Sequence, residues 1–525
     1  MKLSRRSFLQ QSLRFTTFAA LAQAFPGWAA ERSSVYPFSL GVASGSPRHD
    51  SVVLWTRLLP EPLNAAALPP VPYKLRWEIA EDEQFTRMVN KGETHALPEL
   101  AHSVHVEVND LQADRWYWYR FILGDAVSPV ARTRTTPAAD ALVSNLRVAV
   151  ASCQHWEFGE YAAHRHIAAA NPDLVAFLGD YIYEWGPYDL RHPGRPRNRD
   201  IESFSLAEYR ARYAQYKTDL QLQAAHHVAP WIVTWDDHEV ANDYGNDRDE
   251  RLDVNFLLRR AAAFQAFYEH MPVRLHPSHT DFASMRIYDR YEWGRLAKFH
   301  VLDSRQYRSY QACAKTGRGG SNSVSNAECS ERMDPTRTML GIEQEKWLAR
   351  GFASSNAKWN ILTQQTLMAQ SSQTVVSHEG EGKFWTDGWD GYPVARQRLM
   401  EDLQKHKPAN PVVISGDVHT FYAANLKRDF YTKASASNPI VATEFCGTSI
   451  TSSSRPQERT DQYVAQNPHI KYGRSDKRGF MLIDISQTRM QTHFLGLDDV
   501  AKADSGIATL KSFVIEDGKS GVVSA

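Results

Sequence analysis

The chain has 525 residues, of which 42% are apolar and 23% are charged, and Lys plus Arg and Asp plus Glu number 60 each. This length has room for two or more domains with a sizeable core, and the composition is ordinary for a soluble globular protein. Because the charges balance, the chain lacks the basic excess that is typical of nucleic-acid-binding proteins. We therefore expect no specific nucleic-acid partner.

The first 30 residues have the order of an export signal. The motif Ser4-Arg5-Arg6-Ser7-Phe8-Leu9 precedes a mildly apolar stretch at 15–25, and small residues follow at Gly27, Ala29 and Ala30. This twin-arginine pattern predicts a periplasmic or secreted protein that meets the twin-arginine translocase during export. The alternative is an ordinary amphipathic N-terminal helix. No later segment approaches ~18 uninterrupted apolar residues, so we expect no stable membrane anchor.

Residues 35–137 alternate apolar and polar positions, which is typical of strands with one exposed face. The clearest strands are expected at 51–56, 73–79, 103–108 and 116–121. The aromatic run at 116–121 follows Leu111 and looks like the corner of a small sandwich of immunoglobulin or fibronectin type. We therefore expect an N-terminal β-sandwich domain over 35–137, with His102 and His105 as surface residues.

After Asn145 the pattern changes to strands that alternate with helices. Apolar runs predict strands at 146–151, 173–178, 231–235, 359–363 and 411–415, and helices are expected at 161–170, 205–226 and 253–270. A hairpin is expected at 285–302, turning near Trp293-Gly294, and an antiparallel pair at 480–497. The alternation predicts a layered α/β domain with a mixed central sheet over 145–505.

Four cysteines divide into two kinds. Cys313 and Cys329 lie in one loop rich in Gly, Ser and Asn, where a disulfide would cross-link a segment with little core. The sequence leaves this pairing open, because a disulfide needs Cα atoms within about 7 Å. Cys153 and Cys446 occur in apolar strand-like contexts, where a buried inert thiol is the default.

Potential metal ligands follow four of the predicted strands. Reactive groups gather just beyond the carboxyl ends of strands in α/β sheets, so four such ends predict one shared metal site. Taken singly, Asp236-Asp237 could cap a helix, His419 could be a core histidine and Cys153 a packed thiol. The four strand-end motifs are Ser152-Cys153-Gln154-His155, Gly179-Asp180-Tyr181-Ile182-Tyr183-Glu184, Asp236-Asp237-His238-Glu239 and Gly416-Asp417-Val418-His419.

The spacing and chemistry of these residues agree with a metal site. Asp417 and His419 are two apart and would project from the same face of an extended chain. Asp180 and Tyr183 are three apart and would share a side if the chain turns helically. An Asp, a phenolate and the thiolate of Cys153 suit a strongly acidic ion such as Fe(III), whereas Asp and Asn oxygens suit Ca(II).

The four motifs together resemble the alkaline phosphatase D (PhoD-like) family, which belongs to the calcineurin-like and purple acid phosphatase metallophosphoesterases. Segments 302–308 and 444–451, and the order of export signal and β-sandwich, are also similar. The resemblance implies a calcineurin-like layered sandwich of two sheets flanked by helices, behind an immunoglobulin- or fibronectin-like N-terminal domain. It also implies a site that holds one Fe(III) and Ca(II).

By this resemblance, Cys153, Asp180 and Tyr183 would bind iron together with His419, and Asp180 would also bridge to the next ion. Asp237 and Asp417 would bind the neighbouring ion or ions. Purple acid phosphatases have Asp, Asn and His at the positions of Cys153, Asp237 and Asp417, so the second site here is richer in oxygen, which favours Ca(II) over Zn(II). A further histidine of the purple type has no assignable counterpart among Gln364, Gln365 and His378.

The implied activity is that of an alkaline phosphatase acting on small phosphate monoesters, in which a metal-activated hydroxide attacks phosphorus. His238 could protonate the leaving group or stabilise phosphate. Arg305 could clamp phosphate with its planar fork, or form a structural salt bridge. Two alternatives remain: a phosphodiesterase or phospholipase-type enzyme on the same site, and a non-catalytic exported binding protein.

Overall fold

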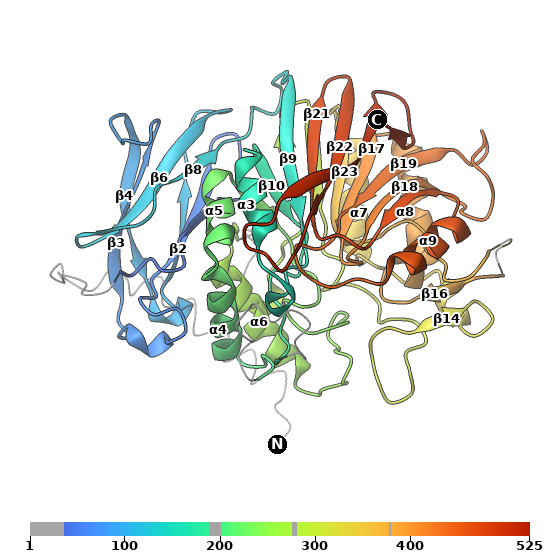
Figure 1. Cartoon of the computed structure of the whole chain (residues 1–525), viewed down its shortest axis with the longest axis horizontal. Coiled ribbons are helices and arrows are strands. Elements are labelled where there is room, and N and C mark those ends of the chain that lie inside the picture. The colour runs from blue at the N-terminus through green and yellow to red at the C-terminus, as the bar shows by residue number, and fades with distance from the viewer. Residues whose placement is uncertain (1–35, 188–200, 276–280, 377, 379) are drawn as a thin grey trace.

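The computed structural model describes residues 36–187, 201–275, 281–376, 378 and 380–525 (Figure 1). The expected export signal at 1–30 lies outside these residues. Within the described ranges, no helix has the length and apolar character needed to cross a membrane.

A ten-stranded sheet connects the N-terminal part of the chain with its C-terminus. β9, β10 and β11 are parallel, so their carboxyl ends lie at one edge of the sheet. The predicted antiparallel pair at 480–497 is confirmed as β21 and β22. In spatial order the strands are β24 (Val523–Ser524), β23 (Ile507–Glu516), β22 (Arg489–Leu497), β21 (Gly479–Ser486), β9 (Asn145–Ala151), β10 (Leu174–Phe177), β11 (Trp231–Val233), β1 (Val42–Gly45), β2 (Val52–Arg57) and β5 (Ser103–Val108).

A seven-stranded sheet packs against the first. The pair β12 and β13 confirms the predicted hairpin at 285–302. The strand pattern alone predicted one mixed sheet, but the buried strands belong to two, because an apolar run does not specify the strand with which it pairs. In spatial order the strands are β12 (Asp289–Trp293), β13 (Ala297–Val301), β15 (Trp359–Thr366), β17 (Pro411–Gly416), β19 (Ile440–Cys446), β18 (Phe421–Lys427) and β20 (Ile470–Arg474).

Apolar side chains fill the space between the two sheets, among them Val148 and Ala176 from the first and Phe299 and Ile414 from the second. The outer face of the ten-stranded sheet is covered by α3 (Ala162–Ala169), α4 (Leu206–Lys217), α5 (Leu220–Val228) and α6 (Phe256–His270). The outer face of the seven-stranded sheet is covered by α7 (Ile342–Ala353) and α8 (Pro393–His406), and α9 (Gln457–Gln466) packs on β20. The molecule is therefore layered as helices, sheet, sheet and helices.

The single helix expected at 205–226 is wrong, because α4 and α5 are separate helices. Asp219 ends the first by capping the second: its side chain accepts hydrogen bonds from the backbone N–H groups of Gln221 and Leu222. An N-cap residue takes non-helical backbone angles, so the chain bends there although apolar residues continue at helical spacing. α4 itself begins with a capping box between Ser205 and Glu208.

The N-terminal residues form a five-stranded sheet that packs against β1, β2 and β5. It contains β4 (Met88–Ala96), β3 (Tyr73–Ala80), β6 (Trp116–Leu123) and β7 (Ala126–Val127), and β8 (Ala131–Arg134) pairs with β6. The hydroxyl of Tyr117 accepts a 2.8 Å hydrogen bond from the backbone N–H of Gln112, which fixes the corner expected from the aromatic run. The expectation of surface positions for His102 and His105 is wrong. His102 is buried, and His105 stacks on Tyr268 of α6 at 4.1 Å, because α6 covers this end of β5.

The structure forms the disulfide between Cys313 and Cys329, with Cα atoms 6.0 Å apart. It cross-links the loop that carries β14 (Ser323–Ser325), which pairs with β16 (Lys383–Trp385). Cys153 and Cys446 are buried free thiols.

Lys217 of α4 is buried where the N-terminal strands meet the α/β region. Its Nζ lies 4.2 Å from the ring centroid of Trp55 and 5.2 Å from that of Tyr181, and burial lowers its pKa to about 7. Between about pH 7 and 10 the unfolded chain therefore holds a proton that the folded chain lacks. Lys217 therefore makes the free energy of unfolding rise with pH between about pH 7 and 10, by at most about 1.4 kcal/mol per pH unit.

Lys217→Met should consequently raise the melting temperature, and by more at pH 7 than at pH 10, because the cost of deprotonating the buried amine falls as the pH approaches the ordinary lysine pKa of about 10.4. Thermal unfolding followed by circular dichroism at both pH values measures the difference between variant and parent. The exposed Lys405 of α8 provides the control Lys405→Met. An equal gain at both pH values would contradict the buried-amine explanation.

Candidate metal centre

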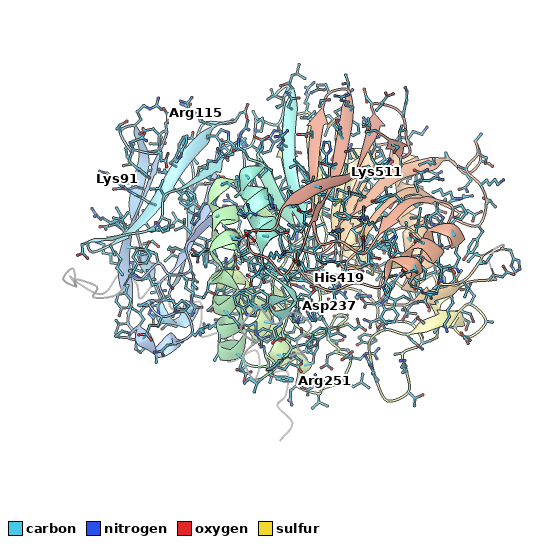
Figure 2. The ribbon with its side chains drawn as sticks, viewed as in Figure 1. Lys91, Arg115, Asp237, Arg251, His419 and Lys511 are labelled. Atoms are coloured by element: carbon cyan, nitrogen blue, oxygen red, sulfur yellow. A yellow bond between two sulfur atoms is a disulfide. The ribbon has the colours of Figure 1, made fainter. Side chains whose placement is uncertain are left out.

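The strand ends converge where the two sheets meet. Cys153 after β9, Asp180 after β10 and His419 after β17 place one ligand atom each within 4.8 Å of one another. Asp180, Asp237 and His238 form an adjoining group by the same measure. Figure 2 labels Asp237 and His419, which lie near each other in the middle of the molecule. The two groups share Asp180, whose carboxylate could therefore contact two cations at once.

Tyr183 completes the first group. Its hydroxyl donates to Asp180 Oδ2 over 2.9 Å and lies 3.3 Å from His419 Nε2. His419 Nδ1 lies 2.7 Å from the carbonyl oxygen of Ser453, an acceptor, so Nδ1 carries the proton and Nε2 faces the site with a free lone pair. This is the arrangement by which proteins orient a metal-binding imidazole.

Four candidate ligand residues share a strained, left-handed backbone conformation. Cys153, Asp180, Asp417 and His419 have φ angles of 61°, 55°, 63° and 54°, in the left-handed region that side chains rarely occupy. Such positions cost of order 1–3 kcal/mol each and concentrate at functional sites. The left-handed residues turn the chain sharply after each strand, which directs their side chains back toward the shared centre.

Two glycines allow the strand ends to approach closely. A Cβ on Gly179 would lie 2.7 Å from the backbone nitrogen of Asp236, and a Cβ on Gly416 would lie 2.4 Å from the hydroxyl of Ser152. Any side chain at these two positions would therefore push the strand ends apart.

The site concentrates buried negative charge that protein groups only partly compensate. Burial raises the pKa of Asp180, Cys153 and Tyr183 well above their ordinary values, and nearby acidic groups add to this. Burial also raises the pKa of Asp417 to about 7. Oδ1 of Asp180 and Oδ1 of Asp237 are buried with no hydrogen-bond donor. Bound cations would compensate these oxygens and keep the ligands deprotonated, so the residues fit a metal centre.

Comparison with known proteins places this centre in a family. A model described as PhoD-like phosphatase matches residues 148–494, and one for the N-terminal domain of PhoD-like phosphatases matches residues 21–137. The chain belongs to the PhoD-like phosphatase family. Alkaline phosphatase D of Bacillus subtilis (strain 168) is 41% identical over 532 residues, which cover 99% of this chain and 88% of that protein. A solved structure described as "Structure of PhoD" is 41% identical, has a TM-score of 0.86 and shares 94% of each chain. The resemblance drawn from the motifs is confirmed.

In this PhoD-like phosphatase, Arg305 is occupied by carboxylates. Its Nε donates to Asp236 Oδ1 over 2.5 Å, and its two terminal nitrogens donate to Asp387 over 3.0 and 2.9 Å. Asp237 Oδ1 lies 3.5 Å from the same guanidinium, whose side chain is 1% exposed. The phosphate clamp is therefore corrected to the alternative, a structural salt bridge, because the planar fork already binds a carboxylate in the bidentate manner.

His238 lies at the second group as the sequence predicts. Its Nδ1 lies 2.8 Å from Glu184 Oε2, and its ring lies 4.1 Å from the ring of Tyr183. Burial opposes protonation, but Asp237, Glu184 and Asp180 outweigh it and raise the pKa of His238 well above its ordinary value. The carboxylate that faces Nδ1 therefore favours the protonated form of this imidazole.

Sequence reasoning missed one carboxylate of the site, Asp387, and did not assign a second one, Asp243, to a metal. Asp237, Asp243 and Asp387 form a third group with ligand atoms within 4.8 Å of one another. Asp387 lies in the loop between β16 and α8, where no strand end marks it, so the strand-end rule could not find it. Asn242 and Asp243 follow the third motif closely and are potential ligands in the sequence, but the motif alone assigned only Asp237 to the metal site.

Between the third and the last motif, none of the histidines that the structure describes joins these ligand groups. Gln365 donates to the carbonyl oxygens of Trp235 and Leu302 over 2.9 and 2.8 Å, and Gln364 donates to that of Thr366. His378 is exposed and lies 3.1 Å from Glu381. The three residues that the sequence left unassigned therefore have hydrogen-bond or ionic partners of their own.

Asp180→Asn should remove the carboxylate shared by the two groups of this PhoD-like phosphatase. We expect bound metal to be lost and turnover to fall by about 100-fold or more, as for removal of a group that stabilises the transition state. Elemental analysis of the folded protein and an assay with a phosphate ester measure the two effects. Asp461→Asn, at an exposed position on α9, is the control. Retained metal with full turnover would refute the role of Asp180.

Proposed function

We propose that this PhoD-like phosphatase hydrolyses small phosphate monoesters in the periplasm or outside the cell, with Fe(III) and Ca(II) at its metal centre. The observation that carries the proposal is the convergence of Cys153, Asp180, Tyr183 and His419 on one point beside a second acidic group. Membership of the family supports phosphate ester hydrolysis.

The donor set supports the choice of metals. A thiolate, a phenolate and a carboxylate from Cys153, Tyr183 and Asp180 suit Fe(III), because all three must be deprotonated to bind. The second group pairs the carboxylates of Asp180 and Asp237, and such oxygen ligands suit Ca(II). Asp417 belongs to the oxygen-rich side, where Thr366 donates to its Oδ2 over 2.5 Å.

Each residue has a role that follows from its contacts. Bound cations supply Lewis-acid activation of water and neutralise charge on phosphate. His238, held by Glu184, delivers its proton to the leaving alkoxide. Arg305 keeps Asp236 and Asp237 fixed relative to each other, so the ligand positions do not relax when substrate arrives.

We also propose that the part of the chain expected at 145–505, which β23 and β24 extend to Ser524, forms a calcineurin-like layered sandwich. The part expected at 35–137 forms an immunoglobulin- or fibronectin-like sandwich. The two facing sheets with helices on both outer faces support the first assignment. The five-stranded sheet packed on β1, β2 and β5 supports the second.

Activity assays with and without chelator test the proposed function. The purified protein should hydrolyse 4-nitrophenyl phosphate, lose this activity in chelator and regain it when iron and calcium are restored together. Assaying bis(4-nitrophenyl) phosphate in parallel separates the alternatives. A higher kcat/KM for the diester would favour a phosphodiesterase, and metal-loaded protein without turnover of either compound would favour a binding protein.

Export by the twin-arginine translocase is tested by the paired change Arg5→Lys and Arg6→Lys. The doubled arginine is what the translocase reads, so the variant should remain in the cytoplasm. Arg14→Lys, which keeps the motif, is the matched control. Activity in periplasmic and cytoplasmic fractions measures export, and unimpaired export of the paired variant would overturn the proposal.

A further inference from the structure

A cavity of about 460 Å³ opens directly beside the metal centre. Its wall includes Asp417 and His419, so an ester bound at the metals can place its alcohol part in this space. Aromatic rings of Trp385, Trp389 and Tyr463 form much of the remaining wall. The cavity is therefore where the leaving group is recognised.

One uncompensated charge lies in the wall of this cavity. Asp390 is engaged by Arg396 Nη1 over 2.7 Å, and Asp417 belongs to the metal centre. The guanidinium of Arg455 is held over the ring of Tyr463, 4.9 Å from its centroid. Among the residues that the structure describes, no carboxylate pairs with Arg455 and no hydrogen bond occupies its guanidinium. Its five donors are free to bind a ligand.

The backbone around Arg455 is tied to the metal centre. The carbonyl of Ser453 accepts from His419 Nδ1 over 2.7 Å, and the hydroxyl of Ser454 lies 3.0 Å from that of Thr420. Pro456 follows and restricts the backbone of Arg455 to extended angles. The fold therefore sets the distance between the backbone of Arg455 and the metal ligands, and the ring of Tyr463 orients the guanidinium.

We propose that Arg455 binds a second anionic group on the alcohol part of the substrate. The preferred substrates are phosphate esters whose alcohol also carries a carboxylate or another phosphate, because a planar guanidinium fork pairs with either in a charge-assisted, bidentate manner. This inference rests on the proposed function and names the substrate class of the same site.

Arg459 offers a matched control. Its guanidinium lies over the same ring of Tyr463, at 4.7 Å, and donates to Gln462 Oε1 over 3.0 Å. It is not part of the cavity wall. Arg459→Ala thus removes the same charge and the same ring contact without changing the cavity.

The test compares three series of esters with equally basic leaving alcohols and the same alkyl chain lengths. The first arm consists of n-alkyl phosphates, the second carries a terminal carboxylate, and the third carries a terminal phosphate. At the best chain length, the parent protein should have a kcat/KM for an anionic ester about tenfold or more above that for the alkyl ester, mainly through KM. Arg455→Ala should abolish this preference, Arg455→Lys should keep part of it and Arg459→Ala should keep all of it.

Elemental analysis of folded Arg455→Ala measures whether its metal centre is intact. Preference for the carboxylate arm or for the phosphate arm supports the inference and tells the two anions apart. Equal kcat/KM for all three arms in the parent, a preference that survives Arg455→Ala, or one that Arg459→Ala removes would each overturn it. Failure of the parent to hydrolyse any of the esters would instead overturn the proposed function, and the inference with it.

Discussion

The ion pairs of Arg305 hold together the ends of the two sheets beside the metal centre. Arg305 follows β13 of one sheet, whereas Asp236 follows β11 of the other, and Asp387 joins them from a loop. Removing one partner from such a buried cluster leaves an uncompensated charge, at a cost of about 3–5 kcal/mol. One arginine cannot balance every acid present, and the excess negative charge on Asp180 and Asp237 is what makes this edge a cation site.

The sequence predicted the convergence of Cys153, Asp180 and His419 because each directly follows a buried strand. Apolar runs show where buried strands end, and the carboxyl ends of parallel strands meet at one edge of a sheet. The partners of Arg305 were not predictable in this way. They lie 69 and 82 positions away in the chain, and whether a guanidinium meets phosphate or carboxylate depends on distances that no local pattern encodes.

Interactions that apolar patterns do not reveal explain the remaining differences between the predicted and the observed fold. Asp219 divides the helix expected at 205–226, because capping by a side chain outweighs apolar periodicity that continues across it. The left-handed backbone at Cys153 was also not predictable from the sequence, since glycine is the only residue type that reliably indicates such angles. The assignment of strands to two sheets depended on tertiary pairing, whereas the positions of the hairpin β12–β13 and the pair β21–β22 followed from alternation and turns.

The pairing of β1 with β11 has a consequence for how the chain can be divided. Gly45 pairs with Trp231 in parallel register, so the N-terminal strands extend the sheet that carries Asp236 and Asp237 at its end. A fragment that begins at residue 145 would expose the edge of β11 as a row of unpaired peptide groups, a template for aggregation. The family models divide the sequence near residue 140, but the hydrogen-bonded sheet does not divide there. A chimera in which the N-terminal part is replaced must therefore keep a strand that pairs with β11 as β1 does.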